Sequence, residues 1–294
     1  MHILVTGGTG FIGSALLDRL LVDGHRLTVL SRSVRNGDPR VSYVQSLEAI
    51  SSDTGIDAII NLAGESLAAK RWSEAYKRKI VASRLETTEA LLALIERLES
   101  PPKVLLSGSA IGYYGAHGNE ALDEQAKPGS GFAADLCQRW EAVASEAGNA
   151  GVRVCLLRLG VVLDRDGGAL VEMVRPFKMG IANWVGDGKQ YLSWIHREDV
   201  VAAIVHLLEQ SHLSGPYNLT APSPVTSRQF CDALKRHLRT LVALPMPAFV
   251  MRTLVGEMAD ELLISGQRVV PGGLEASGFQ FRHSDIDSAL AASL

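Results

Sequence analysis

The sequence contains few cysteines and few aromatic residues. Its three cysteines, Cys137, Cys155 and Cys231, are far apart and form no CxxC pair, so we expect neither a disulfide framework nor a zinc site. Aromatic residues make up 6% of the chain, and no basic block is interleaved with them. The formal net charge is −3, which gives no electrostatic reason to expect a nucleic acid or an anionic membrane as a partner.

Long hydrophobic runs are absent too. No segment reaches the roughly 18 consecutive apolar residues of a transmembrane helix, so we expect no membrane span. The chain starts MHILVTGG, without a charged segment before a long apolar core, so we expect no signal peptide. A reducing cytoplasm is therefore the expected location. The 294 residues suffice for one large domain or two coupled ones.

Short β-branched runs alternate with helix-like segments over the first 160 residues. We predict strands at 2–7, 26–31, 41–45, 57–64, 103–109 and 153–160, and helices at 14–24, 73–100 and 131–148. Strands that are apolar throughout, alternating with amphipathic helices, indicate a parallel sheet covered on both faces. The predicted fold class is therefore α/β, a doubly wound parallel sheet of the Rossmann type.

The alternation ends after residue 160. Gly- or Pro-rich loops such as DRDGGAL and TAPSPVTS separate further predicted helices at 197–210, 227–238 and 247–263. We predict a dinucleotide-binding domain over residues 1–163, with helix 197–210 packing back on it. Residues 164–294 are predicted to form a smaller substrate or cap region, which includes a C-terminal helical segment at 245–294.

The strongest motif is the glycine pattern in LVTGGTGFIGSALLDRLL. Its glycines follow a strand directly and open a helix, which is the context of a dinucleotide fingerprint. Gly7 permits the tight turn, Gly10 lets a pyrophosphate approach the backbone, and Gly13 lets the helix pack closely on the strand. A plain Gly-rich turn is the alternative. The predicted phosphate-binding residues, at a helix N-terminus that favours anions, are Gly7, Thr9, Gly10, Phe11, Ile12 and Gly13.

The end of the second predicted strand indicates which dinucleotide binds. An NAD site has an acidic residue there for the ribose 2′-OH, but this strand ends LSRSVR, with Ser31, Arg32 and Arg35. A hydroxyl and guanidinium groups suit a 2′-phosphate, because the planar Arg fork pairs with phosphate oxygens. NADP(H) is therefore the predicted cofactor, and a solvated basic turn is the alternative.

Several segments together resemble a known family, the extended short-chain dehydrogenases/reductases. They are TGGTGFIG at 6–13, NLAGE at 61–65, SGSAIGYYG at 107–115 and WIHREDVV at 194–201. More closely, the chain resembles the YfcH-like branch, known as NAD-dependent epimerase/dehydratase or nucleoside-diphosphate-sugar epimerase. The resemblance extends over essentially the whole chain, including the C-terminal helical segment.

The resemblance implies further contacts to the cofactor, at Leu62, Ala63, Gly64, Lys79, Arg84 and Val162. The first three would pass under the adenosine half, and Val162 would border the nicotinamide. Arg84 stands where the wider family usually has an Asn facing the cofactor, and Lys79 would reach a phosphate. For Lys79 and Arg84 the alternative is a solvated helix face.

The catalytic residues of the family are only partly present. Extended reductases use a Ser, a Tyr and a Lys four residues beyond the Tyr, and the Lys lowers the pKa of the Tyr so that it can exchange a proton near neutral pH. The resemblance places the Ser at Ser109. It places the other two in GSGFAADLCQRWEA (129–142), at Phe132 and Leu136. Neither of these side chains can exchange a proton.

Other residues are candidates for the missing proton donor. Tyr113 and Tyr114 follow Ser109 closely, and with it they are the predicted catalytic residues; packing of the active-site floor is the alternative for the two tyrosines. His117 is a further candidate, with a solvated loop position as its alternative. We expect His196, just before a predicted helix, to be structural.

A second departure concerns the substrate. Nucleotide-sugar epimerases of this superfamily have an Arg three residues before the Ile of the IH pair, which grips a diphosphate. Here that position is Leu192, and a charge-assisted contact is lost. Arg239 or Lys189 would have to compensate.

Two functions therefore stay open. One is an NADP(H)-dependent oxidoreductase or epimerase that acts on an unidentified small, sugar-like molecule. The other is a non-catalytic NADP(H)-binding protein that senses redox state or serves in assembly. Superfamily members often dimerise through their long helices, so the resemblance implies a homodimer through 73–100 and 131–148.

Overall fold

The computed structural model describes residues 1–33 and 38–294. Its centre is a seven-stranded sheet with the order β12–β7–β5–β4–β1–β2–β3, in which all neighbouring strands are parallel. This confirms the predicted α/β, doubly wound fold. The strands are β1 (His2–Thr6), β2 (Arg26–Leu30), β3 (Val41–Val44), β4 (Ala58–Asn61), β5 (Val104–Ala110), β7 (Arg153–Leu159) and β12 (Gly215–Leu219).

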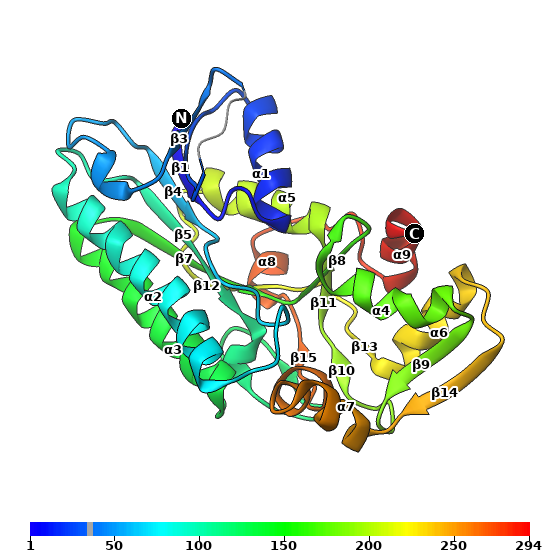
Figure 1. Cartoon of the computed structure of the whole chain (residues 1–294). Coiled ribbons are helices and arrows are strands. Elements are labelled where there is room, and N and C mark those ends of the chain that lie inside the picture. The colour runs from blue at the N-terminus through cyan, green and yellow to red at the C-terminus, as the bar shows by residue number, and fades with distance from the viewer. Residues whose placement is uncertain (34–37) are drawn as a thin grey trace.

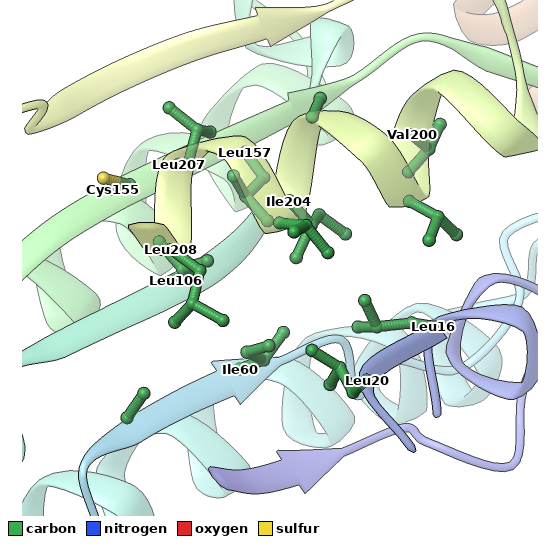
Figure 2. Close-up of a cluster of buried hydrophobic side chains, with 14 of the residues drawn as sticks. Leu16, Leu20, Ile60, Leu106, Cys155, Leu157, Val200, Ile204, Leu207 and Leu208 are labelled. Carbon is green, nitrogen blue, oxygen red and sulfur yellow. The ribbon is translucent and has the colours of Figure 1, made fainter. Parts of the chain in front are cut away.

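Helices cover both faces of this sheet (Figure 1). On one face lie α1 (Phe11–Val22) and α5 (Arg197–Glu209), and on the other lie α2 (Glu74–Arg97) and α3 (Phe132–Ser145). The strands are apolar throughout because both of their faces are buried by helices. Figure 2 shows Leu16 and Leu20 of α1 on the same side of the sheet as Ile60 of β4 and Ile204 of α5. Burial of each such side chain contributes about 1.5–3 kcal/mol.

The second half of the chain forms short strand pairs with their own apolar core, which includes Trp194, Phe177 and Phe230. The short strands outside the central sheet, of which β6 alone comes from the first half of the described chain, are β6 (Ala121–Leu122), β8 (Val161–Asp164), β9 (Ile181–Val185), β10 (Tyr191–Leu192), β11 (Trp194–His196), β13 (Val225–Thr226), β14 (Val242–Met246) and β15 (Arg268–Val269). They pair as β8–β11, β9–β14, β10–β13 and β6–β15. The helices are α4 (Gly168–Lys178), α6 (Ser227–His237), α7 (Ala248–Val255), α8 (Gly272–Ala276) and α9 (Ile286–Ser293).

Two features of this half were not anticipated from its sequence. The helix predicted at 247–263 is divided into α7 and a π turn at Asp260–Ile264, because Gly256 ends α7 with a φ of +69°. The central sheet also takes its last strand, β12, from the region beyond residue 163. The predicted division at residue 163 stays a prediction, since both halves of the chain contribute to the central sheet.

The strand order predicts a ligand-binding crevice at the carboxyl ends of the strands, beside β1. From β1 the chain runs outward to β2 and β3, and then returns to β4 on the other side of β1. Ligands of doubly wound sheets bind at such a reversal, at the carboxyl ends of the strands. The N-termini of α1 and α2 lie at this end, because α1 follows β1 and α2 follows β4.

Candidate cofactor and catalytic site

The loop between β1 and α1 has the backbone of a phosphate-binding turn. Gly7 has a φ of +69°, in the left-handed region that glycine favours, and Gly10 N donates to Gly7 O at 2.9 Å. A Cβ atom on Gly13 would collide with the backbone of Gly7, so α1 can approach β1 only with glycine there. Gly10 is exposed, and a Cβ on it would meet only Gly7 O, at 3.2 Å. Its outer side is therefore open to a ligand.

A cavity of about 520 Å³ lies beside this loop. The first turn of α1 leaves N–H groups without helical partners, and the positive end of the helix dipole lies there as well. Both favour an anion in this cavity. Ile12 is half-buried and packs against the sheet core, so it would contribute its backbone N–H. The cavity is lined by Thr9, Gly10, Phe11, Ser14, Ala15, Asp18, Asp166 and Arg197.

Arg197 forms part of this cavity, and it was not among the site residues predicted from the sequence. Its Nε lies 3.1 Å from Asp164 Oδ2 and its Nη2 lies 2.9 Å from Asp166 Oδ2. The guanidinium also lies 5.0 Å from the centroid of the Phe11 ring. The two carboxylates thus hold Arg197 against the phosphate loop. Only the fold brings these residues together, because Arg197 and Phe11 are 186 positions apart.

The end of β2 carries the residues predicted to bind the 2′-phosphate. Ser31 is buried, and its hydroxyl donates to Ser33 O at 2.9 Å, so it shapes the turn. Arg32 is exposed directly after it. Arg35 lies outside the described residues. Of the described residues at the end of β2, Arg32 is therefore the one placed to meet a phosphate.

Lys79, on α2, already forms an ion pair with Glu65, which follows β4. Its Nζ is 2.9 Å from Glu65 Oε1. The hydrogen bond from Lys79 lowers the pKa of Glu65, and the charge of Arg32 adds to that effect. Arg32 and Lys79 therefore share one electropositive rim, at the ends of β2 and β4, with Glu65 between them.

A second cavity, of about 360 Å³, lies at the ends of β2 and β3. This cavity was not predicted from the sequence, because the residues that line it come from several elements. Among its lining residues are Leu30 after β2, Gln45 and Ser46 after β3, and Thr87 and Ala90 on α2. Leu62 and Ala63, which follow β4, are half-buried and Gly64 is exposed; their contact with a cofactor stays a prediction.

A buried hydrogen-bond chain fixes the carboxyl end of β4. Asn61 Oδ1 accepts from Thr6 Oγ1 at 2.6 Å, and Asn61 Nδ2 donates to Thr88 Oγ1 at 2.9 Å. Trp140 Nε1 also donates to Thr88 Oγ1, at 3.0 Å. The chain links β1, β4, α2 and α3, so it ties the middle of both helices to the carboxyl end of β4.

Ser109 lies at the end of β5, and its hydroxyl is engaged by a buried ion pair. Ser109 Oγ donates to Glu141 Oε1 at 2.6 Å. Arg158 binds both oxygens of Glu141, each at 2.8 Å. All three residues are at most 7% exposed. Since the Ser109 proton points at the carboxylate, Ser109 can only accept a hydrogen bond from a ligand.

The two tyrosines after Ser109 differ sharply in their surroundings. Tyr114 is fully buried; its hydroxyl donates to Asn218 Oδ1 at 2.7 Å and accepts from Arg158 Nη1 at 2.9 Å. Burial raises the pKa of Tyr114 to about 12. Tyr113 is half-buried, and the Arg158 guanidinium lies 3.6 Å from its ring centroid. Tyr113 is the better placed of the two to reach a ligand.

The helix α3 turns a different face toward β5 than the resemblance implied. Phe132 and Leu136 pack in an apolar cluster with residues of α2, and the Phe132 ring lies 5.0 Å from that of Trp72. The face toward β5 carries Cys137, Trp140 and Glu141, and Ala133 lies against Gly112, just beyond the strand. A Cβ on Gly112 would lie 3.1 Å from the Ala133 Cβ.

Cys137 lies against Ala110 and the Ser109 hydroxyl, and burial raises the pKa of its thiol to about 11. The groups of α3 that contact Ser109 are thus the protonated thiol of Cys137 and the carboxylate of Glu141. No Tyr–Lys pair lies on this face of α3, which belongs wholly to the described residues.

The glycine-rich start of α3 is explained by a residue from the C-terminal region. Glu261 accepts hydrogen bonds from Phe132 N and Ala133 N, both at 3.2 Å. Its carboxylate caps α3, whose N-cap residue, Gly131, offers no side chain for that role. A Cβ on Gly131 would collide with Glu261 Oε1, and its φ is +106°. Glycine is therefore required at position 131, where Glu261 of the C-terminal region contacts the start of α3.

The remaining predicted positions lie as follows. Val162 is half-buried in β8 and pairs with Ile195 of β11. His117 contacts Glu120 in its own loop, with Nδ1 3.3 Å from the carboxylate. Leu192 is half-buried in β10.

The two candidates for the missing diphosphate contact, Lys189 and Arg239, are both exposed. Lys189 Nζ lies 3.9 Å from Asp187.

His196, Glu198 and His283 have ligand atoms within 4.8 Å of one another, which is a possible metal set by spacing. However, His196 Nδ1 accepts from Glu198 N at 3.2 Å, as the N-cap of α5. Neutral His196 therefore carries its proton on the buried Nε2, whereas a nitrogen that binds a metal must be unprotonated. The arrangement fits the structural role predicted for His196 rather than a metal site.

Comparison with known proteins gives a family match. Residues 3–220 match the model of the NAD dependent epimerase/dehydratase family, and residues 246–293 match a domain of unknown function, DUF1731. An epimerase family protein of Mycobacterium leprae is 39% identical over 291 residues, which cover 98% of this chain and 94% of that protein.

Two solved structures are similar over the whole chain. The crystal structure of human epimerase family protein SDR39U1 with NADPH has a TM-score of 0.89 at 35% identity, covering 99% of this chain and 98% of that one. The nucleoside-diphosphate sugar epimerase from Corynebacterium glutamicum has a TM-score of 0.81 at 30% identity, covering 100% of this chain and 58% of that one. The finer placement in a YfcH-like branch stays a prediction. No described helix is long and apolar enough to cross a membrane.

Proposed function

We propose that this chain, which belongs to the NAD dependent epimerase/dehydratase family, binds NADP(H) and catalyses oxidoreduction or epimerisation of a small, sugar-like molecule. The observation that carries the proposal is the open phosphate loop at the N-terminus of α1, with Arg32 at the end of the neighbouring strand β2. A relative that is 35% identical, human SDR39U1, was solved with NADPH, which supports the same cofactor here.

The residues present fit this cofactor. Gly10 has an open outer side at a helix N-terminus, where a pyrophosphate is favoured. Arg32 would bind the 2′-phosphate, and the cavity beside Ser46 and Thr87 lies where an adenine base would reach past the end of β3. The segment Leu62–Gly64 would pass under the adenosine, and Val162 would border the nicotinamide.

The residues around Ser109 would orient the substrate. NADP(H) would supply the hydride donor or acceptor. Ser109, whose proton is held by Glu141, would accept a hydrogen bond from a substrate hydroxyl, which suits a sugar-like molecule. Tyr113 or a bound water would move the proton, because Tyr114 is enclosed and has a pKa of about 12. On α3, Cys137 and Glu141 contact Ser109, and the charge of Glu141 is paired with Arg158.

The cofactor assignment is tested by titrating the protein with NADPH and NADH, using nicotinamide fluorescence. We expect NADPH to bind more tightly. The substitution Arg32→Ala should weaken NADPH binding by about 1–3 kcal/mol, the scale for a lost charged hydrogen bond, and should leave NADH binding almost unchanged. Arg19→Ala, at an exposed arginine on α1, is the matched control. Equal affinity for the two dinucleotides in the wild type would contradict the role of Arg32.

Catalysis is tested separately, by following NADPH oxidation and NADP⁺ reduction with a panel of sugars and their keto derivatives. We expect turnover with at least one of them, and a loss of kcat in Ser109→Ala and Tyr113→Phe with NADPH binding retained. Tight NADPH binding without turnover across the panel would favour a non-catalytic NADP(H)-binding protein instead.

A further inference from the structure

The ion pair between Arg197 and Asp166 lies in the wall of the cavity beside the phosphate loop. Thr9, Gly10 and Phe11 of that loop line the same cavity, of about 520 Å³. Arg197 Nη2 lies 2.9 Å from Asp166 Oδ2, and Arg197 Nη1 donates to Phe11 O at 3.4 Å. The guanidinium therefore borders the space that an anion at the phosphate loop would fill.

Two carboxylates hold this guanidinium, and they differ in exposure. The Asp164 side chain is 10% exposed, and its Oδ2 lies 3.1 Å from Arg197 Nε. The Asp166 side chain is 62% exposed. A buried ion pair leaves an uncompensated charge behind when one partner departs, whereas an exposed pair contributes little because water screens it. Asp164 is therefore a fixed anchor for Arg197, and Asp166 is an exchangeable partner.

Asp166 can release the guanidinium by a rotation of its side chain alone. Its backbone is held separately, because Asp166 N donates to Asp164 Oδ1 at 2.8 Å. Gly167 and Gly168, the next two residues, lie against the Phe11 ring, where a Cβ atom on them would be 2.9 Å and 2.7 Å from ring carbons. The segment therefore stays on the phosphate loop whether or not the Asp166 carboxylate is paired.

Two other basic residues that the resemblance placed at the cofactor do not line this cavity. Arg84 lies against Gly64, where a Cβ atom would be 3.0 Å from the Arg84 Cζ, and its Nη1 donates to Glu65 O at 3.1 Å. Lys79 forms an ion pair with Glu65 at 2.9 Å. Among the described residues that line the cavity, Arg197 is thus the one cation.

The charges of the cavity favour an exchange of partners when a dinucleotide binds. The Asp166 carboxylate repels a pyrophosphate, because the two negative charges would share one cavity. A guanidinium binds phosphate oxygens through charge-assisted hydrogen bonds, which its planar fork suits. Replacement of Asp166 by a pyrophosphate at Arg197 therefore gains a strong contact and removes a repulsion, and it loses only a screened ion pair.

We propose that Arg197 binds the pyrophosphate of the dinucleotide, and that Asp166 competes with the pyrophosphate for the same guanidinium nitrogen. When the dinucleotide binds, its pyrophosphate takes the place of Asp166 at Nη2, and Asp164 keeps Nε. NADPH and NADH share the pyrophosphate, so this contact acts on both alike, whereas Arg32 acts on the 2′-phosphate of NADPH alone. The inference rests on the proposed function, because it requires a dinucleotide at the phosphate loop.

The test is the dissociation constants of NADPH and NADH, measured by isothermal titration calorimetry. Arg197→Gln should weaken the binding of both about tenfold or more, the scale of a lost charged hydrogen bond. Asp166→Asn should tighten the binding of both about threefold, the scale on which an exposed ion pair competes. If the ion pair only braced the phosphate loop, Asp166→Asn would weaken binding instead, so the direction of the change separates the two roles.

A double variant shows whether Asp166 acts through Arg197. With Arg197→Gln and Asp166→Asn combined, binding should equal that of Arg197→Gln alone, because no guanidinium is left to release. The matched control is the exposed pair Arg236–Asp287, 2.6 Å apart and outside the cavity lining. Arg236→Gln and Asp287→Asn should leave both dissociation constants unchanged.

Weaker or unchanged binding in Asp166→Asn overturns the inference and leaves the proposed NADP(H) site intact. Unchanged binding in Arg197→Gln, or a gain from Asp166→Asn that persists in the double variant, overturns it as well. Failure of the wild type to bind either dinucleotide contradicts the proposed function itself. If Arg197→Gln does not fold, as its melting temperature without cofactor would reveal, Arg197→Lys takes its place in the comparison. A lysine keeps the charge beside Asp164 but has no fork to hold a second anion, so the gain should disappear there too.

Discussion

At the scale of single residues, the buried pair of Glu141 and Arg158 determines what Ser109 and Tyr114 can do. Glu141 accepts a hydrogen bond from the Ser109 hydroxyl, and Arg158 donates to the Tyr114 hydroxyl at 2.9 Å. Two of the predicted catalytic residues are thus tied into one buried network. The third, Tyr113, contacts this network through its ring alone.

The Glu141–Arg158 pair should show strong coupling in a double-mutant cycle. Glu141→Gln and Arg158→Gln each leave one buried charge unpaired, so each should lower the free energy of unfolding by about 3–5 kcal/mol. The double variant should lose much less than the sum, because it leaves no unpaired charge. Urea unfolding followed by circular dichroism provides the measurement. The exposed pair Glu172–Arg175 is the control, with a coupling of about 0–1 kcal/mol. Additive losses at Glu141 and Arg158 would refute this account.

At the scale of elements, α3 is held at its start by the C-terminal region. Glu261 lies in the π turn that follows α7, and it caps α3 through two backbone N–H groups. Lys77 of α2 adds an ion pair with Glu257, at 2.5 Å. Phe132 and Leu136 close the apolar cluster beneath these contacts. The start of the segment GSGFAADLCQRWEA therefore packs against the C-terminal region.

Removal of the Glu261 carboxylate should loosen the start of α3 specifically. In Glu261→Ala the N–H groups of Phe132 and Ala133 lose their acceptor, and a lost N-terminal cap costs about 0.5–2 kcal/mol. We expect faster hydrogen exchange at these two amides, measured by NMR or mass spectrometry. Exchange within α1 should be unchanged, and Glu172→Ala on the exposed face of α4 should have no effect at α3. Unaltered exchange at Phe132 and Ala133 would show that Glu261 does not act as the cap.

At the scale of the whole molecule, weakly acidic groups are buried on both sides of the central sheet. Burial raises the pKa of the Cys137 and Cys155 thiols to about 11 and that of the Tyr114 hydroxyl to about 12. Cys155 lies in the core beneath α5, whereas Cys137 faces the crevice. All three groups are protonated in the folded protein at neutral pH.

The protein should therefore lose stability at alkaline pH. Because each pKa is higher in the folded state, the stabilisation is complete below the unfolded thiol pKa of 9.0 and is lost as pH rises toward about 11 for the thiols. For Tyr114 the loss spans pH 10.0 to about 12. Urea unfolding across pH 8–12 (roughly the window of these groups) provides the measurement. The double variant of Cys137→Ala and Cys155→Ala should flatten the lower part of the curve and leave the upper part. A flat profile throughout would contradict the burial of these groups.

Much of the fold follows from the sequence because it depends on local chemistry. Strands that are apolar throughout require cover on both faces, and the glycine at position 13 is needed wherever a helix must start close against a strand. The phosphate loop and the basic end of β2 belong to one βαβ unit, so their proximity needs no long-range information. These features, with Ser31 and Arg32, determined the Rossmann fold and the predicted cofactor.

The tertiary structure decided what depends on the rotation and partners of a helix. Both sides of α3 are buried, so its apolar periodicity could not tell whether Phe132 and Leu136 or Ala133 and Cys137 lie toward β5 and the segment that follows it. The cap from Glu261 and the bond between Ser109 and Glu141 join residues 129 and 32 positions apart, and no local pattern encodes such a pairing. The sequence by itself determined that a dinucleotide fold is present. The packing of α2, α3 and the C-terminal region decided which side chains surround the reacting end of the site, because each of those contacts forms only when distant segments meet.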